Sequence, residues 1–240
     1  MKNDINKNHW DELAGNYSKT WKGYGKNEMN KREMEFIAKY LKKSNQNLLL
    51  DLGVGNGRIL ETLFENTKIN SEIYGLDVSS KMVAICKEKY KNIQKIKKLN
   101  TCDIANEAFP FNKNFDFITA IRVLKYNKNW REIINKIYKE LNHDGIFVFT
   151  MVNSISINRF FKYKIPIYRT NIIELRRILL EYRFKILEIR SFTKLPDFFY
   201  DNSKNEFFAK IVIFLEELLE TIFGKIFLGR ILFIAVKKDE

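Results

Sequence analysis

The sequence predicts an α/β protein, a three-layer sandwich in which a seven-stranded, mostly parallel sheet with an antiparallel last strand lies between layers of helices. Three observations predict it. Short apolar runs alternate with amphipathic segments over most of the 240 residues. The run 48–52 is apolar except for Asp51, as in a strand that is buried on both faces of a parallel sheet. A glycine-rich loop joins that run to a helical segment.

Apolar runs bounded by turn residues predict the strands, and the run at 96–101 gives the weakest strand signal. In chain order they are expected at 48–52, 72–76, 96–101, 115–120, 145–151, 184–191 and 230–236. The helices are justified by apolar side chains at a spacing of three or four residues. In chain order they are expected at 9–17, 30–41, 57–65, 81–90, 130–141, 171–182 and 205–224. In the helix at 81–90, Met82, Ile85 and Cys86 are expected to face inward.

A length of 240 residues suits one decorated domain, and a hydrophobic content of 45% allows a substantial core. We expect an N-terminal helical cap over residues 1–44. The α/β domain should follow over 45–240, with a helical insert at about 203–226 before the last strand. Only three prolines occur, and none lies in a linker-like run.

The net charge of +13 is spread along the chain and is interpreted mainly as a solvated background typical of a low-GC coding bias. Cys86 and Cys102 form no C-x-x-C pair, so neither a disulfide framework nor a metal site is expected. The N-terminus lacks the apolar core of a secretory signal. Charged residues interrupt the apolar stretch near the C-terminus, which excludes a transmembrane segment. These features together predict a cytoplasmic protein.

The segment LLLDLGVGNGRIL carries the main functional signal. Gly53, Gly55 and Gly57 follow a buried strand and precede a helix, whose first N–H groups can bind an anionic group. The dinucleotide fingerprint G-x-G-x-x-G does not fit, because Gly57 comes one place early and Arg58 occupies the expected position. Asp51 would repel a pyrophosphate, but it suits a ligand that carries an ammonium group.

Two further acidic residues follow the next two strands. Asp77 ends the second strand and is expected to accept the hydroxyl groups of a ribose; capping of the next helix by Asp77, Ser79 or Ser80 is the alternative. Asp103 follows the third strand and is expected to bind the exocyclic amine of an adenine. An ordinary turn aspartate is the alternative there.

Together these residues resemble the class I, seven-stranded, Rossmann-like methyltransferases that depend on S-adenosylmethionine. The segment from Asp51 to Gly57 matches the family's D-x-G-x-G-x-G loop. DVSSKM looks like its second motif, and CDI with FPFNKNFDFITA resembles its third and fourth. YKELNHDGIFVF resembles the segment before the fifth strand, although Lys139, His143 and Asp144 depart from the pattern. The resemblance runs from about residue 48 to residue 238.

The resemblance implies a cofactor site for S-adenosylmethionine. The loop backbone would hold the methionine end, and Asp77 would bind the ribose. Val78 and Met82 would contact the adenine ring, whereas Asp103 and Ile104 would meet its edge. The residues so implied are Tyr17, Asp51, Gly53, Gly55, Gly57, Asp77, Val78, Met82, Asp103, Ile104 and Ile121. Of these, Ile121 would lie beside the methionine moiety and Tyr17 would cover the site, with packing of an amphipathic helix as the alternative for Tyr17.

Many small-molecule relatives place a histidine after the fourth strand, but here Lys125 stands at the comparable place, so no catalytic residue is assigned. Arg122, Lys125 and Tyr126 are expected to bind an anionic or polyhydroxylated acceptor. The alternative is that Lys125 is a solvated loop residue. The aromatic and basic segment after the fifth strand is expected to cover the acceptor, with Arg159 and Tyr163 in contact with it.

The sequence therefore predicts methyl transfer to an oxygen or nitrogen atom of a small or medium-sized acceptor. RNA methylation is the alternative, with the basic run 87–98 as its support. No Pro-Pro motif of exocyclic-amine methyltransferases occurs, and nucleic acid is the less favoured partner. A non-catalytic scaffold and an NAD-linked oxidoreductase are disfavoured by the glycine loop. The insert helix could belong to a core, a subunit interface, a substrate channel or a membrane surface. The acceptor stays open, as does the choice between monomer and homodimer.

Overall fold

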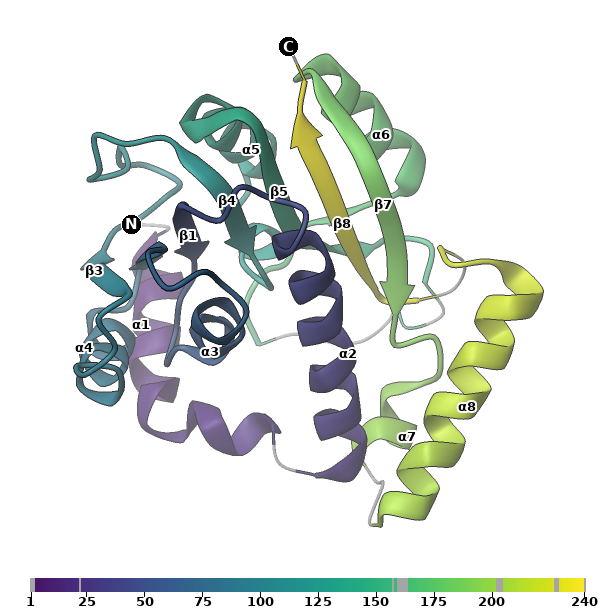
Figure 1. The fold of residues 1–240 in the computed structure, drawn as a ribbon. Coiled ribbons are helices and arrows are strands. Elements are labelled where there is room, and N and C mark those ends of the chain that lie inside the picture. The colour runs from purple at the N-terminus through teal and green to yellow at the C-terminus, as the bar shows by residue number, and fades with distance from the viewer. Residues whose placement is uncertain are drawn as a thin grey trace.

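The computed structural model describes residues 3–21, 23–156, 158, 164–201, 205–226 and 229–239. Over these residues the centre of the protein is a sheet in the order β3-β2-β1-β4-β5-β8-β7, with β6 paired to β5 off this path. Figure 1 shows β3, β1, β4, β5, β8 and β7 following one another across the sheet in this order. The strands are β1 Leu48–Leu52, β2 Glu72–Asp77, β3 Ile96–Thr101, β4 Phe115–Ala120, β5 Leu141–Asn153, β6 Arg169–Thr170, β7 Phe184–Phe192 and β8 Ile231–Lys238.

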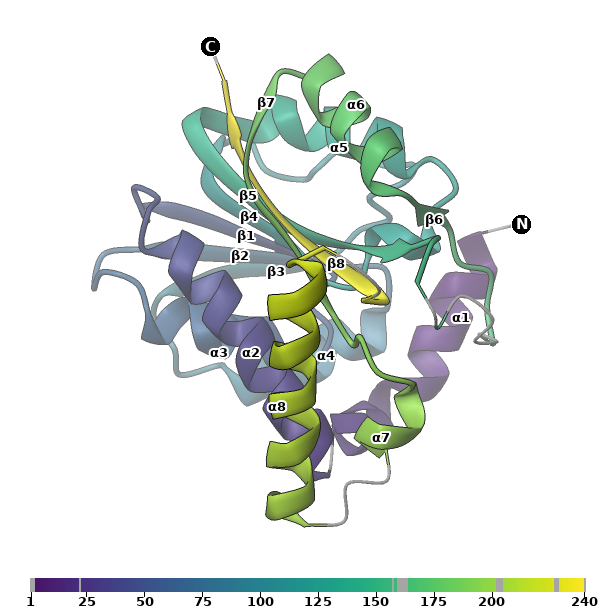
Figure 2. The ribbon, with the colours of Figure 1, turned by 90° about the vertical axis from the view of Figure 1, so that its right-hand side faces the viewer.

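Helices cover both faces of the sheet. They are α1 Asn3–Leu13, α2 Tyr24–Leu41, α3 Arg58–Glu65, α4 Ser80–Lys89, α5 Trp130–Glu140, α6 Ile172–Glu181, α7 Asp197–Asp201 and α8 Glu206–Phe223, with 3-10 turns η1 Ala14–Trp21 and η2 Leu124–Tyr126. Figure 2 shows α5 and α6 on one side of the sheet and α2, α3, α4 and α8 on the other. Each layer has its own core cluster, with Trp130 in one and Phe36 in the other.

The sheet is mostly parallel, as expected. β1 pairs in parallel with β2 and β4, and β3 and β5 continue the parallel pairing outward. β8 is antiparallel to both β5 and β7, so it fills the space between them. The predicted α/β sandwich with an antiparallel last strand is therefore confirmed.

The largest differences from the expected elements lie at helix and strand ends. α2 begins at Tyr24, six residues before the expected start at residue 30, and β5 begins at Leu141 rather than at residue 145. The expected helix at 9–17 is instead α1 followed by the 3-10 turn η1. The inward placement of Ile85 is wrong, because α4 buries Met82, Val83 and Cys86 and leaves Ile85 39% exposed.

The basic run 87–98 spans the end of α4 and the first half of β3, which is the last strand at one end of the sheet order. Lys97 and Lys98 are exposed on this strand. Charged side chains on an edge strand oppose pairing with another chain, which gives these lysines a structural role. Within the described ranges, no helix is long and apolar enough to cross a membrane.

Candidate active site

A cavity of about 540 Å³ opens at the carboxyl ends of β1, β2 and β4. Along the sheet, β2 and β3 lie on one side of β1, and β4 and β5 on the other, so the chain changes direction at β1 and β4. Ligands of open α/β sheets bind at such a switch point. The walls come from the loops after β1, β2, β3 and β4, from α1 and α2, and from Thr193, Tyr200 and Arg230 on the far side.

The three glycines of the loop after β1 differ in what surrounds them. All three have positive φ, 72° at Gly53, 53° at Gly55 and 88° at Gly57, a conformation that side chains disfavour. A Cβ atom at Gly53 would lie 2.1 Å from Val123, and one at Gly57 would lie 2.1 Å from Tyr90. A Cβ at Gly55 would have the Gly53 carbonyl oxygen, 3.9 Å away, as its nearest neighbour. The space over Gly55 is therefore open, and Gly55 lines the cavity.

Asp77, at the end of β2, holds this loop in place. Its Oδ2 accepts a hydrogen bond from the Gly55 N–H at 2.8 Å, and its Oδ1 accepts one from the Ser79 N–H at 2.8 Å. Ser79, rather than Asp77, caps α4, because its hydroxyl accepts from the Met82 N–H at 3.1 Å. Burial raises the pKa of Asp77, although the backbone N–H donors oppose this shift. Asp77, Val78 and Met82 all line the cavity.

Asp51 lies behind the glycine loop and does not line the cavity. The side chain is fully buried, and Oδ1 accepts a hydrogen bond from the Thr119 hydroxyl at 2.7 Å. Among the described residues, Oδ2 has no hydrogen-bond partner. Burial raises the pKa of Asp51 to about 7, against the opposing effects of Thr119 and Arg58.

Asp103 stabilises the turn after β3 and also borders the cavity. Its carboxylate accepts from the Ala105 N–H at 3.0 Å and from the Asn106 amide at 2.9 Å, which stabilises the turn after β3. Asp103 and Ile104 also line the cavity, beside Cys102. The turn contacts therefore orient a carboxylate that borders the ligand space.

The N-terminal helix closes one side of the cavity through contacts that no local sequence pattern predicts. Asn6 on α1 donates to the Tyr126 carbonyl oxygen at 3.0 Å, and the Trp10 ring lies edge-on to Tyr126 with 5.3 Å between centroids. Asp11 accepts from the Ser79 hydroxyl at 2.5 Å. Tyr17, from η1, lines the cavity and contacts Trp10 with 5.9 Å between ring centroids.

A buried carboxylate that we did not predict organises the other side. Glu33 on α2 has no exposed surface and forms ion pairs with Arg58, at 3.0 Å, and with Arg122. Burial opposes ionisation of Glu33, but the two arginines outweigh it and hold its pKa below the ordinary value. Arg122 has a φ of 64°, and its backbone N–H donates to the Thr150 hydroxyl at 2.6 Å. Arg58 and Arg122 are thereby fixed in the cavity wall.

Lys125 is not a solvated loop residue. It lies in the 3-10 turn η2, is 5% exposed and lines the cavity, with its ammonium group 4.7 Å from the centroid of the Tyr126 ring. The turn brings the side chain inward because the backbone reverses directly after β4. The residues that line the cavity with a cationic side chain are Lys26, Arg58, Arg122, Lys125 and Arg230.

The structure brings most of the predicted site residues together. Those that line the cavity are Tyr17, Gly53, Gly55, Asp77, Val78, Met82, Asp103, Ile104, Ile121, Arg122, Lys125 and Tyr126. Asp51 and Gly57 lie behind the wall, and Arg159 and Tyr163 lie outside the described residues. The roles of all these residues stay predictions. Sequence reasoning missed Trp10, Lys26, Tyr200 and Arg230, since no local pattern marks them.

Comparisons with known proteins agree with this geometry. Residues 50–149 match the family described as "Methyltransferase domain". An uncharacterized protein of Methanocaldococcus jannaschii, MJ1252, is 31% identical over 153 residues, which cover 63% of this chain and 53% of that protein. An uncharacterized methyltransferase of Schizosaccharomyces pombe, C1347.09, is 31% identical over 125 residues, which cover 48% of this chain and 42% of that protein. The chain thus spans about half the length of the curated relatives it matches.

Among solved structures, the magnesium protoporphyrin IX methyltransferase ChlM of Synechocystis PCC 6803, crystallised with bound SAH, is similar in fold. The TM-score is 0.66 and the sequence identity is 13%, over 98% of this chain and 99% of that chain. An identity this low shows a shared fold and carries no information on the acceptor.

Proposed function

We propose that the chain is a class I, Rossmann-like, S-adenosylmethionine-dependent methyltransferase, which the match of residues 50–149 to the methyltransferase-domain family supports, and that it methylates an anionic small or medium-sized acceptor at a carboxylate oxygen. The observation that carries the acceptor class is the charge of the cavity wall. Five cationic side chains line the cavity, and Asp77 and Asp103 are the carboxylates that line it. The buried Glu33 behind the wall pairs with Arg58 and Arg122, so the described wall still has more cationic groups than carboxylates. The carboxylates of Asp77 and Asp103 lie at the end where the cofactor is expected.

The cavity fits the cofactor at its Gly55 end. The open space over Gly55 lets a ligand approach the backbone, and Asp77 presents a carboxylate beside it. Val78, Met82 and Ile104 supply apolar surface for an adenine ring, and Asp103 lies at its proposed edge. Asp51, which lies behind the loop, would act on the ligand through the backbone of that loop.

Bound there, S-adenosylmethionine supplies a methyl group that is activated by a sulfonium centre. The protein's own task is to orient the acceptor and to exclude water. α1 covers one side of the cavity through Asn6 and Trp10, which limits access of solvent. Arg122 and Lys125 are placed directly after β4, where they would hold an anionic acceptor against the cofactor.

A carboxylate acceptor also fits the chemistry of the wall. Its oxygen is already deprotonated at neutral pH, so it needs no general base. In the part of the wall that the structure describes, no histidine is present. Tyr200 donates its hydroxyl to Glu216 at 2.7 Å, and burial raises its pKa above the ordinary value, so Tyr200 is not suited to accept a proton.

Calorimetry tests the cofactor assignment. We expect S-adenosylmethionine and S-adenosylhomocysteine to bind and NAD to give no heat. Asp77→Ala should weaken binding by at least about 100-fold, because it removes both the ribose acceptor and the contact that holds Gly55. Glu88→Ala, at an exposed position near the end of α4, is the control. Tight binding of S-adenosylmethionine to Asp77→Ala would contradict the assignment of this carboxylate.

Transfer of labelled methyl groups to fractionated metabolite pools tests the acceptor. We expect label in the acidic small-molecule fraction, and its release as methanol in alkali, since methyl esters hydrolyse there. Lys125→Met should raise the KM for the acceptor about tenfold and leave the affinity for S-adenosylmethionine within about twofold. Label in the RNA fraction, or label that resists alkali, would overturn the carboxylate proposal while leaving the cofactor assignment in place.

A further inference from the structure

α8 exposes an apolar face that no other described part of the chain covers. We define this α8 face by six side chains, Phe207, Ile211, Phe214, Leu215, Leu218 and Ile222, which are 74%, 38%, 63%, 37%, 44% and 61% exposed. The exposed parts of these six side chains together amount to about three whole side chains, or roughly 550 Å². The largest apolar patch on a typical monomer is about 300–600 Å² and is often functional, so this face lies at the upper end of that range.

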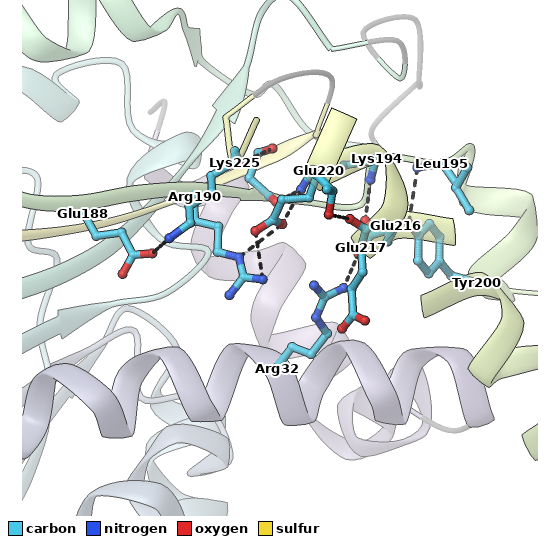
Figure 3. Close-up of polar contacts among 12 residues, drawn as sticks. Arg32, Glu188, Arg190, Lys194, Leu195, Tyr200, Glu216, Glu217, Glu220 and Lys225 are labelled. Carbon is cyan, nitrogen blue, oxygen red and sulfur yellow. Dashed lines mark hydrogen bonds and ion pairs between the residues drawn. The ribbon is translucent and has the colours of Figure 1, made fainter. Parts of the chain in front are cut away.

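The opposite side of α8 is polar and buried, and it prevents the helix from turning its apolar face inward. Glu216 has no exposed surface and accepts hydrogen bonds from Arg32 at 2.5 Å, from the Lys194 N–H at 2.5 Å and from the Tyr200 hydroxyl at 2.7 Å (Figure 3). Glu220 forms ion pairs with Arg190 at 3.0 Å and Lys194 at 3.1 Å. Rotation of α8 would separate these buried charges from their partners, which is strongly unfavourable.

α8 also lies at the outside of the molecule. Its inner side packs on α2, and in Figure 2 it is the element nearest the viewer, with no other element drawn in front of it. The face is therefore open to a partner.

The charge of α8 does not suit a lipid surface. Helices that lie on membranes carry Lys and Arg on the polar side, where they meet anionic headgroups. α8 has four glutamates and a single lysine, Lys210, although the whole chain has a net charge of +13. The positive charge of the protein is thus not placed where a membrane contact through this face would need it.

The α8 face is complementary to itself. Its six positions are separated by four, three, one, three and four residues, a spacing that reads the same in both directions. Two copies of α8 packed antiparallel around a two-fold axis would place Phe207 against Ile222 and Ile211 against Leu218, with Phe214 and Leu215 at the axis. Isologous interfaces require such self-complementary surfaces.

The charges beside this face agree with the same arrangement. Lys210 and Glu217 are both exposed and lie on one edge of the face, two turns apart and on opposite sides of its centre. In the antiparallel pair, Lys210 of each copy would lie beside Glu217 of the other, so the symmetry would create two ion pairs. With Phe208 and Phe223, which are also exposed on α8, the apolar area is roughly 700 Å², close to the roughly 800 Å² that each partner contributes to a standard interface.

From these observations we propose that the chain is a homodimer in which the α8 faces of two copies pack antiparallel around a two-fold axis. Sedimentation equilibrium of the full chain, from below 1 to about 100 µM, tests it and should show a reversible dimer. Phe214→Glu should raise the dimer dissociation constant by at least about 30-fold, as expected for a central contact. Ile69→Glu, at an 85% exposed position away from α8, is the control and should leave the dimer intact. Circular dichroism should show both variants to be folded.

A charge exchange tests the antiparallel register. Lys210→Glu and Glu217→Lys should each weaken the dimer about three- to tenfold, and the double variant should restore it, since each copy then offers the reversed pair. A wild-type chain that stays monomeric over this range would overturn the proposal. So would a dimer that Phe214→Glu leaves unchanged, or a double variant weaker than both single variants. Co-sedimentation of a monomeric chain with phosphatidylglycerol vesicles would assign the face to lipid instead.

Discussion

Asp51 shows how a single buried carboxylate can be present in a sequence motif without touching the ligand space. The side chain is enclosed behind the glycine loop, with Thr119 as its hydrogen-bond donor. Glu33 is equally buried, but its charge is neutralised by Arg58 and Arg122. The contrast follows from the partners, since paired charges tolerate burial and an incompletely paired charge instead changes its protonation.

The raised pKa of Asp51 predicts a pH-dependent stability. In the folded protein this pKa is about 7, whereas its ordinary value is 3.8, so the folded state binds the proton more tightly than the unfolded state. The resulting contribution is complete below about pH 4 and is lost as the pH rises towards 7. Asp51→Asn should therefore gain about 2–3 kcal/mol relative to wild type between pH 5 and pH 8. Denaturant unfolding of both proteins at the two pH values checks this, and an unchanged difference would contradict it.

Among the elements, α1 most directly couples structure to function, because it is attached to the cavity wall through a few polar and aromatic contacts. Asp11 accepts from the Ser79 hydroxyl and, at 3.3 Å, from the Lys81 N–H, so it connects α1 to the start of α4. Trp10 packs on Tyr126, after β4. An element held by few contacts can open with a low free-energy cost, as exchange of a bound cofactor requires.

Asp11→Ala should release α1 from α4. We expect faster hydrogen exchange in α1 and a roughly tenfold weaker affinity for S-adenosylmethionine, since hydrogen bonds to a charged group contribute about 1.5–3 kcal/mol. Glu12→Ala changes an exposed neighbour on the same helix and serves as the control. Unchanged protection of α1 in the Asp11 variant would show that the aromatic contacts hold this helix without the carboxylate.

For the whole molecule, the last strand is the element that unites the sheet. β8 pairs with β5 from Ile146–Lys237 to Val152–Ile231 and with β7 along its other edge. Residues from Ile231 to Val236 are almost completely buried. The C-terminal strand therefore lies inside the sheet, and both of its neighbours depend on it for their hydrogen bonds.

Removal of residues 231–240 should prevent stable folding, because it leaves β5 and β7 with unpaired edges and exposes the core on both faces. We expect an insoluble product, or a soluble one without a cooperative thermal transition by circular dichroism. A chain that lacks only residues 239 and 240 keeps all of β8 and should unfold like the complete chain. Cooperative unfolding of the shorter chain would contradict this role of β8.

Features that depend on the local sequence could be predicted, whereas features that depend on tertiary contacts could not. Strands such as Leu48–Leu52 and Phe115–Ala120 were predicted with their observed bounds, because side-chain periodicity reflects local backbone geometry. Ile85 was placed on the wrong side of α4, since the choice between adjacent faces depends on what packs against the helix. Glu33 could not be linked to Arg122, because 89 residues separate them and no local pattern relates the two positions.

The sequence alone determined the α/β class, the glycine loop and the acidic residue at the end of β2. These features depend on neighbouring residues in the chain, whose backbone preferences act over a few positions. Only the tertiary structure decided that Lys125 is buried, that Asp51 lies behind the cavity wall and that α8 buries glutamate while it exposes phenylalanine. Such outcomes arise because burial and charge pairing are set by segments that are distant in the chain and meet only when the sheet is assembled.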